Sequence, residues 1–153
     1  MVRIYLVQHG QSKSKEEDPE RRLTEKGISE TKSIGEILLK MGIRVNKVYH
    51  SGKARAQMTA EILSKYIGNP EIMKADGLNP LDEPNQWYTK LSKIDEDIMI
   101  VGHLPHLSKL ASMLLSVHNK EIVKFSYSGV LCLEKNDEWK IVWFIKPENL
   151  AKD

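Results

Sequence analysis

The stretch Val2-Arg3-Ile4-Tyr5-Leu6-Val7-Gln8-His9-Gly10 opens the chain and decides the fold. The run from Val2 to Val7 is rich in β-branched and aromatic residues, which predicts a buried strand. A histidine and a glycine follow at the carboxyl end of that strand, just before a polar segment. Ligands bind at this edge of the sheet in open α/β folds. One such motif is weak evidence by itself, but it predicts where a site would begin.

Two further segments repeat this arrangement, because each follows another apolar run. They are Ser51-Gly52-Lys53-Ala54-Arg55-Ala56-Gln57-Met58-Thr59-Ala60 and Gly102-His103-Leu104-Pro105. All three motifs are therefore expected at the carboxyl ends of strands, where they can form one site together.

Strand and helix patterns alternate along most of the chain. Strands are expected at 2–7, 45–50, 71–74 and 98–101, and helices at 24–41, 54–67, 86–94 and 105–114. Residues 11–22 and 78–84 are expected to be loops. The end differs, because 128–134 and 139–145 alternate around a polar turn and predict an antiparallel hairpin. We therefore expect a three-layer α/β/α sandwich, with a mainly parallel sheet and a C-terminal antiparallel hairpin.

Composition excludes several classes of protein. The 153 residues are 41% hydrophobic and 29% charged, which suits a single folded domain over 1–153 and argues against disorder. The net charge of +2 is too small to predict a basic surface that binds nucleic acid. No apolar stretch is long enough to span a bilayer, and the start of the chain lacks signal-peptide architecture. The single cysteine, Cys132, cannot form an internal disulfide, so we expect a cytoplasmic protein.

The three motifs together suggest a phosphate site. An imidazole such as that of His9 can attack phosphorus and carry the phosphoryl group covalently. The planar guanidinium of Arg55 can hold two phosphoryl oxygens at once. A helix starting near Leu104 would offer free backbone N–H groups, and His103 would donate a further hydrogen bond as charge develops. No metal or cofactor is needed if enough cationic donors converge.

These residues resemble the histidine phosphatase superfamily, also called the phosphoglycerate mutase-like fold, over nearly the whole chain. The family's opening Arg-His-Gly stands here as Gln8-His9-Gly10. The other matches are Leu23-Thr24-Glu25-Lys26-Gly27 for its Leu-Thr-x-x-Gly, the segment from Ser51 to Ala60 for its Ser-x-x-x-Arg-Ala-x-x-Thr-Ala, and Gly102-His103 for its late Gly-His. The short length and Gly102-His103-Leu104-Pro105 are most similar to SixA-type phosphohistidine phosphatases.

The resemblance implies a role for each matched residue. His9 would be the nucleophile, Arg55 a phosphate clamp and His103 the group that stabilises the transition state. Gln8 and the backbone near Leu104 would complete the phosphate site. The implied activity is metal-independent hydrolysis through a phosphohistidine intermediate, acting on phosphohistidine in a protein. The alternatives are a general phosphomonoesterase of small molecules and a catalytically weak phosphate-binding module.

Two features depart from the family pattern. Gln8 replaces an arginine, so it can hydrogen-bond phosphate but brings no charge. The interval that carries a cap in larger relatives is short here, which predicts a shallow pocket suited to phosphate displayed on a protein surface. Asp82 and Glu83 are the candidates for a general acid in that interval.

The remaining polar and aromatic residues have plainer interpretations. His106 is expected on a helix surface rather than at a metal, His118 on the surface, and His50 at the end of a strand with a smaller chance of lining the pocket. Cys132 is expected in packing or at an exposed edge. Ser12 is expected to be a turn residue, with contact to phosphate as the alternative. Three tryptophans are expected to pack in the core or hairpin: Trp87, Trp139 and Trp143.

Overall fold

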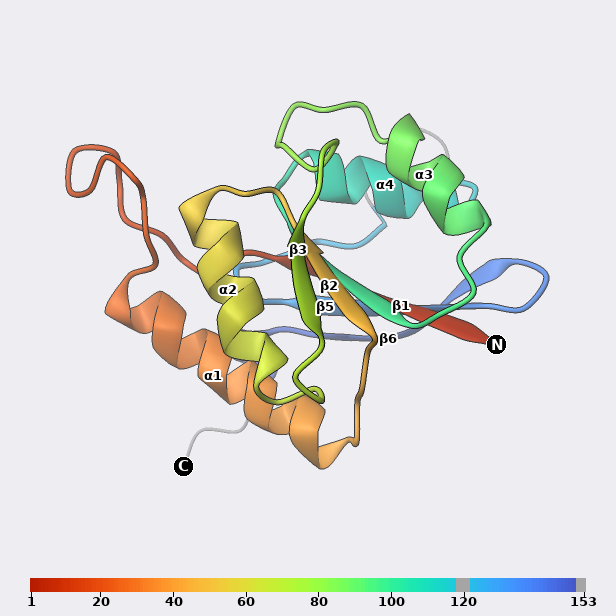
Figure 1. The fold of residues 1–153 in the computed structure, drawn as a ribbon, viewed down its shortest axis with the longest axis horizontal. Helices are drawn as coiled ribbons and strands as arrows, with labels where there is room; N and C mark the ends of the chain where they lie inside the picture. The colour runs from red at the N-terminus through yellow and green to blue at the C-terminus, as the bar shows by residue number, and fades with distance from the viewer. Residues whose placement is uncertain (118–121, 151–153) are drawn as a thin grey trace.

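The computed structural model describes residues 1–117 and 122–150, in which a six-stranded sheet lies between two layers of helices (Figure 1). The strands are β1 (Val2–Gln8), β2 (Lys47–His50), β3 (Glu71–Lys74), β4 (Ile98–Gly102), β5 (Val130–Lys135) and β6 (Trp139–Ile145). The helices are α1 (Glu25–Lys40), α2 (Ala54–Ser64), α3 (Asn85–Ser92), α4 (His106–Leu114) and the 3₁₀ turn η1 (Pro147–Asn149).

The strand order across the sheet is β3-β2-β4-β1-β5-β6. The pairs β1–β4, β2–β4 and β2–β3 are parallel, as expected where each connection is a helical crossover. β5 pairs antiparallel with both β1 and β6, so the predicted C-terminal hairpin is present. The mainly parallel α/β architecture is thus confirmed.

Helices cover both faces of the sheet. Successive residues of a strand point to opposite faces, so Leu6 joins a core cluster with α3 and α4, whereas Val7 joins a second cluster with α1 and α2. Figure 1 shows α1 and α2 together on one side and α3 and α4 on the other. Burial from both sides explains why residues 4–7 of β1 and 98–101 of β4 are continuous apolar runs rather than alternating ones.

Element boundaries agree with the sequence within a few residues. Thr24 caps α1 as predicted, because its Oγ1 accepts a hydrogen bond from the N–H of Gly27 at 2.9 Å. α2 ends at Ser64 rather than at residue 67, since the N–H groups of Tyr66 and Ile67 bond three residues back, in a tighter turn. β5 starts two residues late because Ser128 has a φ of +62°.

Several interpretations of single residues can be checked directly. Cys132 is fully buried in β5, so it is a packing residue and not an exposed edge. Trp87 is 2% exposed, and Trp139 and Trp143 pack against the two core clusters, as predicted. His118 lies outside the described residues. Within the described ranges, no helix has both the length and the apolar character that crossing a bilayer requires.

Candidate active site

The carboxyl ends of three adjacent strands meet at one edge of the sheet. Gln8 at the end of β1 is in register with Gly102 at the end of β4, and the N–H of His9 donates to the Gly102 carbonyl at 3.0 Å. His50 at the end of β2 is in register with Val101 of β4. The three sequence motifs therefore follow neighbouring strands, as expected from a mainly parallel sheet.

His9 is buried with one ring nitrogen engaged. Its side chain is 7% exposed, and Nδ1 lies 2.7 Å from the carbonyl oxygen of Gly10. A carbonyl only accepts, so Nδ1 carries the proton and the neutral ring keeps its lone pair on Nε2. Burial lowers the pKa of His9 to about 4; the Gly10 bond opposes this, and the charges of Arg55 and Arg21 reinforce it. The ring is therefore neutral near pH 7.

The loop after His9 is fixed by buried hydroxyls. The N–H of Gly10 donates to Thr59 Oγ1 at 2.9 Å, and Thr59 lies on α2. A Cβ on Gly10 would come within 2.8 Å of Thr31 Oγ1 and 3.2 Å of the Gly27 carbonyl oxygen, so only glycine fits without a shift. Thr31 Oγ1 lies 2.7 Å from that same carbonyl and 2.8 Å from Ser128 Oγ. Both helices of one layer thus position the loop after His9.

His103 faces His9 across the site. Their ring centroids are 5.0 Å apart, and His103 is 1% exposed. His103 Nε2 lies 2.6 Å from Ser51 Oγ, which also accepts from the N–H of Lys53 at 3.3 Å. Burial, followed by the charges of His9 and Arg55, lowers the pKa of His103 to about 3. When Ser51 donates to Nε2, the neutral ring carries its proton on Nδ1.

Three buried polar atoms of the predicted site have no hydrogen-bond partner within the described residues. They are Gln8 Oε1, Arg55 Nε and His103 Nδ1. Buried polar groups are paired in the great majority of cases, so such a group calls for an explanation. Burial, followed by the charge of Arg21, lowers the pKa of Arg55. Two of the three atoms belong to groups that donate, and the Gln8 amide presents a donor when its O and N exchange places. The arrangement can therefore receive an anion.

The structure adds residues that sequence reasoning did not place here. The Tyr127 ring lies 5.7 Å from the His9 ring and is 43% exposed, so it stands at the mouth of the site. Ser51 and Thr59 were within a recognised motif but had no assigned role. Arg21 lies in the 11–22 segment, expected only as a surface loop, yet its charge acts on both His9 and Arg55. Nothing in the local sequence distinguishes it from its neighbour Arg22.

The expectation of a surface position for His106 is wrong. His106 is 0% exposed, since the loop before α3 covers the start of α4, and neither ring nitrogen has a hydrogen-bond partner within the described residues. Its backbone N–H donates to the Pro80 carbonyl at 3.2 Å, so this first N–H of α4 is not free for an anion. Leu104, two residues earlier, is half-buried at the edge of the first core cluster.

The other candidates have structural contacts of their own. His50 is buried, and its Nδ1 accepts from the N–H of Gly52 at 3.0 Å, so it supports the turn before α2. Ser12 Oγ accepts from Arg21 Nη2 at 3.2 Å. Asp82 Oδ2 accepts from the N–H of Asn79, and its charge partly offsets the burial that lowers the pKa of His106. Glu83 is exposed.

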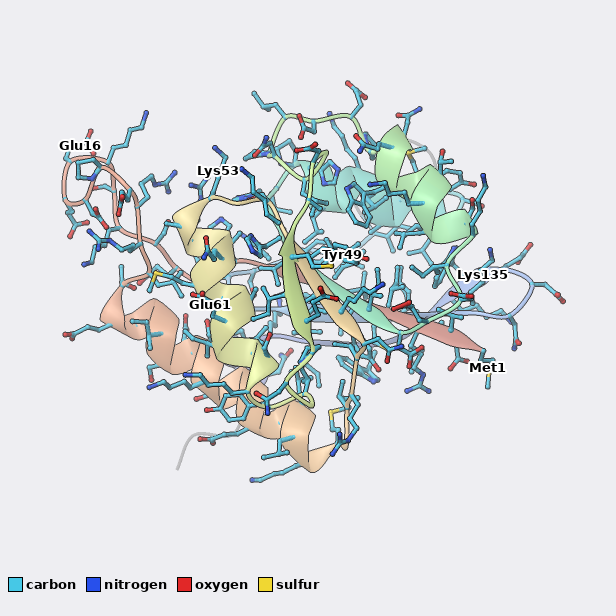
Figure 2. The ribbon with its side chains drawn as sticks, in the orientation of Figure 1. Met1, Glu16, Tyr49, Lys53, Glu61 and Lys135 are labelled. Atoms are coloured by element: carbon cyan, nitrogen blue, oxygen red, sulfur yellow. The ribbon has the colours of Figure 1, made fainter. Side chains whose placement is uncertain are left out.

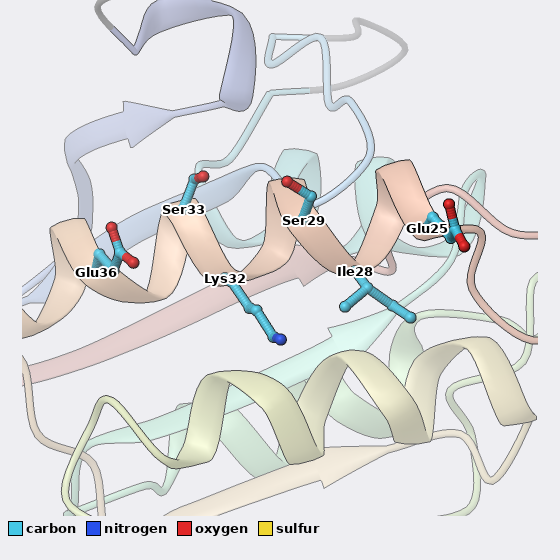
Figure 3. A pocket seen from close by; sticks show the side chains of 6 residues that line it. All are labelled: Glu25, Ile28, Ser29, Lys32, Ser33 and Glu36. Carbon is cyan, nitrogen blue, oxygen red and sulfur yellow. The ribbon is translucent and has the colours of Figure 1, made fainter.

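Other possible ligand sites lie away from these residues. A shallow groove runs along α1, lined by side chains of that helix alone, including Ile28 and Lys32 (Figure 3). It contains none of the residues described above. Within residues 1–117 and 122–150, no three His, Cys, Asp or Glu side chains are grouped so that they could ligate a metal ion.

Comparisons with known proteins agree with this geometry. A family model of the histidine phosphatase superfamily (branch 1) matches residues 4–86, just over half of the chain. An uncharacterised protein of Picosynechococcus is 26% identical over 139 residues, which cover 86% of this chain and 84% of that protein. The 2,3-bisphosphoglycerate-dependent phosphoglycerate mutase of Bartonella bacilliformis is 33% identical over 103 residues, 61% of this chain but only 47% of the mutase.

Solved structures extend the fold similarity to almost the whole chain. The protein histidine phosphatase SixA complexed with tungstate has a TM-score of 0.85 at 19% identity, covering 97% of this chain and 99% of that one. A putative phosphohistidine phosphatase SixA from Agrobacterium tumefaciens has a TM-score of 0.80 at 22% identity, covering 95% and 97%. At these identities the similarity establishes the fold.

Proposed function

This chain belongs to the histidine phosphatase superfamily, and from that premise we propose that it hydrolyses phosphohistidine in a protein through a covalent intermediate on His9. The observation that carries the proposal is the state of His9: buried, neutral, and with Nδ1 held by the Gly10 carbonyl, so that Nε2 is free to attack. We take residues 1–153 as one catalytic domain. We place it in the cytoplasm, because Cys132 is the only cysteine.

In the first step, His9 Nε2 attacks phosphorus and the bond to the substrate breaks. Arg55 Nε, His103 Nδ1 and the Gln8 side-chain NH₂ donate to the phosphoryl oxygens. The Gln8 amide does so with its O and N exchanged, so each of the three unpartnered positions gains a hydrogen bond. When the substrate is phosphohistidine, the electron pair of the broken P–N bond stays on the departing imidazole. That imidazole leaves as a neutral ring if its other nitrogen is already protonated.

In the second step, water attacks phosphorus and the bond to His9 Nε2 breaks. The electron pair returns to Nε2, inorganic phosphate leaves, and the proton of water passes to phosphate or solvent. Ser51 keeps His103 in the orientation and tautomer that present Nδ1–H to the phosphoryl group throughout both steps.

Leaving-group chemistry favours phosphohistidine over ordinary monoesters. An alkoxide is a poor leaving group and needs a general acid, and we assign neither Asp82 nor Glu83 to that role: Asp82 Oδ2 is hydrogen-bonded to the N–H of Asn79, and Glu83 is exposed. The connection from β3 to α3 is the short segment 75–84, which leaves no room for a cap domain. Tyr127 at the mouth is half-exposed, so a side chain on a protein surface can reach His9.

Trapping the intermediate tests the reaction. The protein is mixed with a phosphohistidine protein labelled with ³²P and quenched in alkali, in which a phosphoramidate survives; acid removes the label. We expect label on the wild type and none on His9→Asn. His103→Asn is the matched control, because it removes the facing imidazole yet keeps the nucleophile, so label should form more slowly. Folded wild type that never acquires label would show that the covalent mechanism is wrong.

Substrate comparison tests the specificity. We expect a higher kcat/KM for a phosphohistidine protein than for small phosphomonoesters. Turnover of one small metabolite with no action on phosphoproteins would support the general phosphomonoesterase instead. Oxyanion binding without turnover of either class would support the phosphate-binding module.

A further inference from the structure

Gln8 leaves the end of β1 without a charge at the point where the phosphoryl group is expected. Gln8 is 8% exposed, so little water can reach this position to help stabilise a bound anion. A charge-assisted hydrogen bond is roughly twice as strong as a neutral one. A site built on Gln8 alone at this position would therefore bind the transferred group weakly, unless another cation is nearby.

Arg21 is such a cation, and its own loop holds it in place. The backbone at Arg21 has a φ of +53°, and its side chain bonds to residues earlier in the 11–22 segment. Its Nε donates to the Lys13 carbonyl at 3.1 Å, and its Nη2 donates to Ser12 Oγ at 3.2 Å. Ser12 lies three residues after His9 and pairs with Leu23 in an isolated β-bridge. The guanidinium is thus tied to the nucleophile loop itself.

The positive charge of Arg21 has no carboxylate partner within residues 1–117 and 122–150. The nearby carboxylates form ion pairs with Arg22 instead. Arg22 Nε lies 3.0 Å from Asp18 Oδ2 and 3.6 Å from Glu20 Oε2. Glu16, at the tip of the loop, points away from the sheet (Figure 2). Burial is the main reason that the pKa values of His9 and Arg55 are lowered, and the charge of Arg21 adds to this lowering in both groups.

Unpaired like charges kept close together are unfavourable in a folded protein unless an anion relieves them. We propose that Arg21 is a second phosphate-binding arginine, which supplies from the loop after β1 the positive charge that Gln8 lacks at the end of that strand. The inference rests on the proposed function, since the anion it binds is the transferred phosphoryl group. Arg21 and Arg55 then hold different oxygens of that group.

Binding of inorganic phosphate, measured by calorimetry, tests this assignment without turnover. Arg21→Gln should weaken binding about tenfold or more, as expected for the loss of one charged donor. Lys15→Gln is the matched control, because it removes the same charge from the same loop at an exposed position. It should change affinity less than about twofold. Equal effects of the two substitutions would overturn the inference.

A double variant tests whether Arg21 replaces the missing charge. Gln8→Arg should raise phosphate affinity by a larger factor in the Arg21→Gln protein than in the wild type, because the two arginines serve the same anion. The same factor in both backgrounds would show that Arg21 does not substitute for an arginine at position 8.

An NMR titration keeps the proposal testable if phosphate binds too weakly to measure. Arg21→Gln should raise the pKa of His9, whereas Lys15→Gln should leave it unchanged; an unchanged pKa in Arg21→Gln would place Arg21 away from the site. Wild-type protein that binds no oxyanion would count against the proposed function. Wild-type binding that Arg21→Gln does not weaken would count against Arg21 alone.

Discussion

Lowering the pH from 7.5 to 5 should destabilise this protein, because its two site histidines are buried in the neutral form. The pKa of His9 is lowered to about 4 and that of His103 to about 3, from an ordinary value near 6.5. At pH 5 both rings are protonated in the unfolded chain and neutral in the folded one. The unfolded state then binds more protons, so the free energy of unfolding falls as the pH falls.

The size of the effect follows from these values. Between pH 7.5 and 5, each ring removes about 2 kcal/mol from the free energy of unfolding, or about 4 kcal/mol for the pair. The two rings lie 5.0 Å apart, so a proton on one disfavours a proton on the other and both stay neutral at pH 5. His50 and His106 act in the same direction, since burial lowers the pKa of each. The total is a large part of the stability of a domain of this size.

Urea unfolding, followed by circular dichroism at half-unit steps of pH, measures this dependence. Readings above pH 5 avoid most of the titration of carboxylates. Near pH 5.5 the pair should account for about two protons taken up on unfolding, and His9→Asn or His103→Asn should each remove about one. Inorganic phosphate should restore stability most at low pH, because a bound anion favours the protonated rings.

A result that leaves the proton uptake of His9→Asn equal to that of the wild type would refute this reasoning. It would mean that the folded protein binds the proton on His9 as readily as the unfolded chain does. The ring would then be largely protonated below pH 6.5. The account of His9 as a nucleophile kept neutral by burial would fail with it.

Three further predictions concern the site directly. Ser51→Ala should lower kcat by roughly tenfold to a hundredfold with little change in KM, because His103 Nε2 loses the group that fixes its tautomer; steady-state kinetics on a phosphohistidine protein measures this. Gln8→Arg should raise kcat/KM for monoesters more than for phosphohistidine, since the poorer leaving group gains more from added charge; the ratio of the two values in each protein decides it. Gly10→Ala should destabilise the fold by about 1–3 kcal/mol in urea unfolding, because its Cβ would meet Thr31 Oγ1 at 2.8 Å.

The two central strands were predictable because β4 and most of β1 are apolar runs. A strand covered on both faces, such as β1 or β4, needs no alternation, and its burial follows from composition alone. The helix at α1 was predictable from its capping threonine as well as from its periodicity. The ends of α2 and β5 were less predictable, because backbone turns decide them and the side chains there fit either state.

The clustering of the candidate site residues was predictable only where they lie in contiguous motifs at strand ends. His9, Arg55 and His103 each follow a recognisable strand, so topology alone brings their backbones together. Burial of His106 depends on the 78–84 loop folding over α4, which no periodicity within α4 reveals. The effect of the Arg21 charge on His9 depends on the path of an irregular loop. It also depends on Asp18 forming its ion pair with Arg22 rather than with Arg21.

The position of the second arginine affects what the site can accept. An arginine at the end of β1 would be held by the strand and by neighbouring core residues, so its geometry would be preorganised for one small group. Arg21 is held instead by two hydrogen bonds within an irregular loop outside the sheet, where fewer neighbouring core residues surround it. Such a site stabilises the transition state less strongly, but it is more accessible to a large substrate. This combination suits a reaction whose leaving group departs easily and whose phosphoryl group is displayed on a protein. Breaking the P–N bond then requires less transition-state stabilisation, and a protein substrate requires more space around the site.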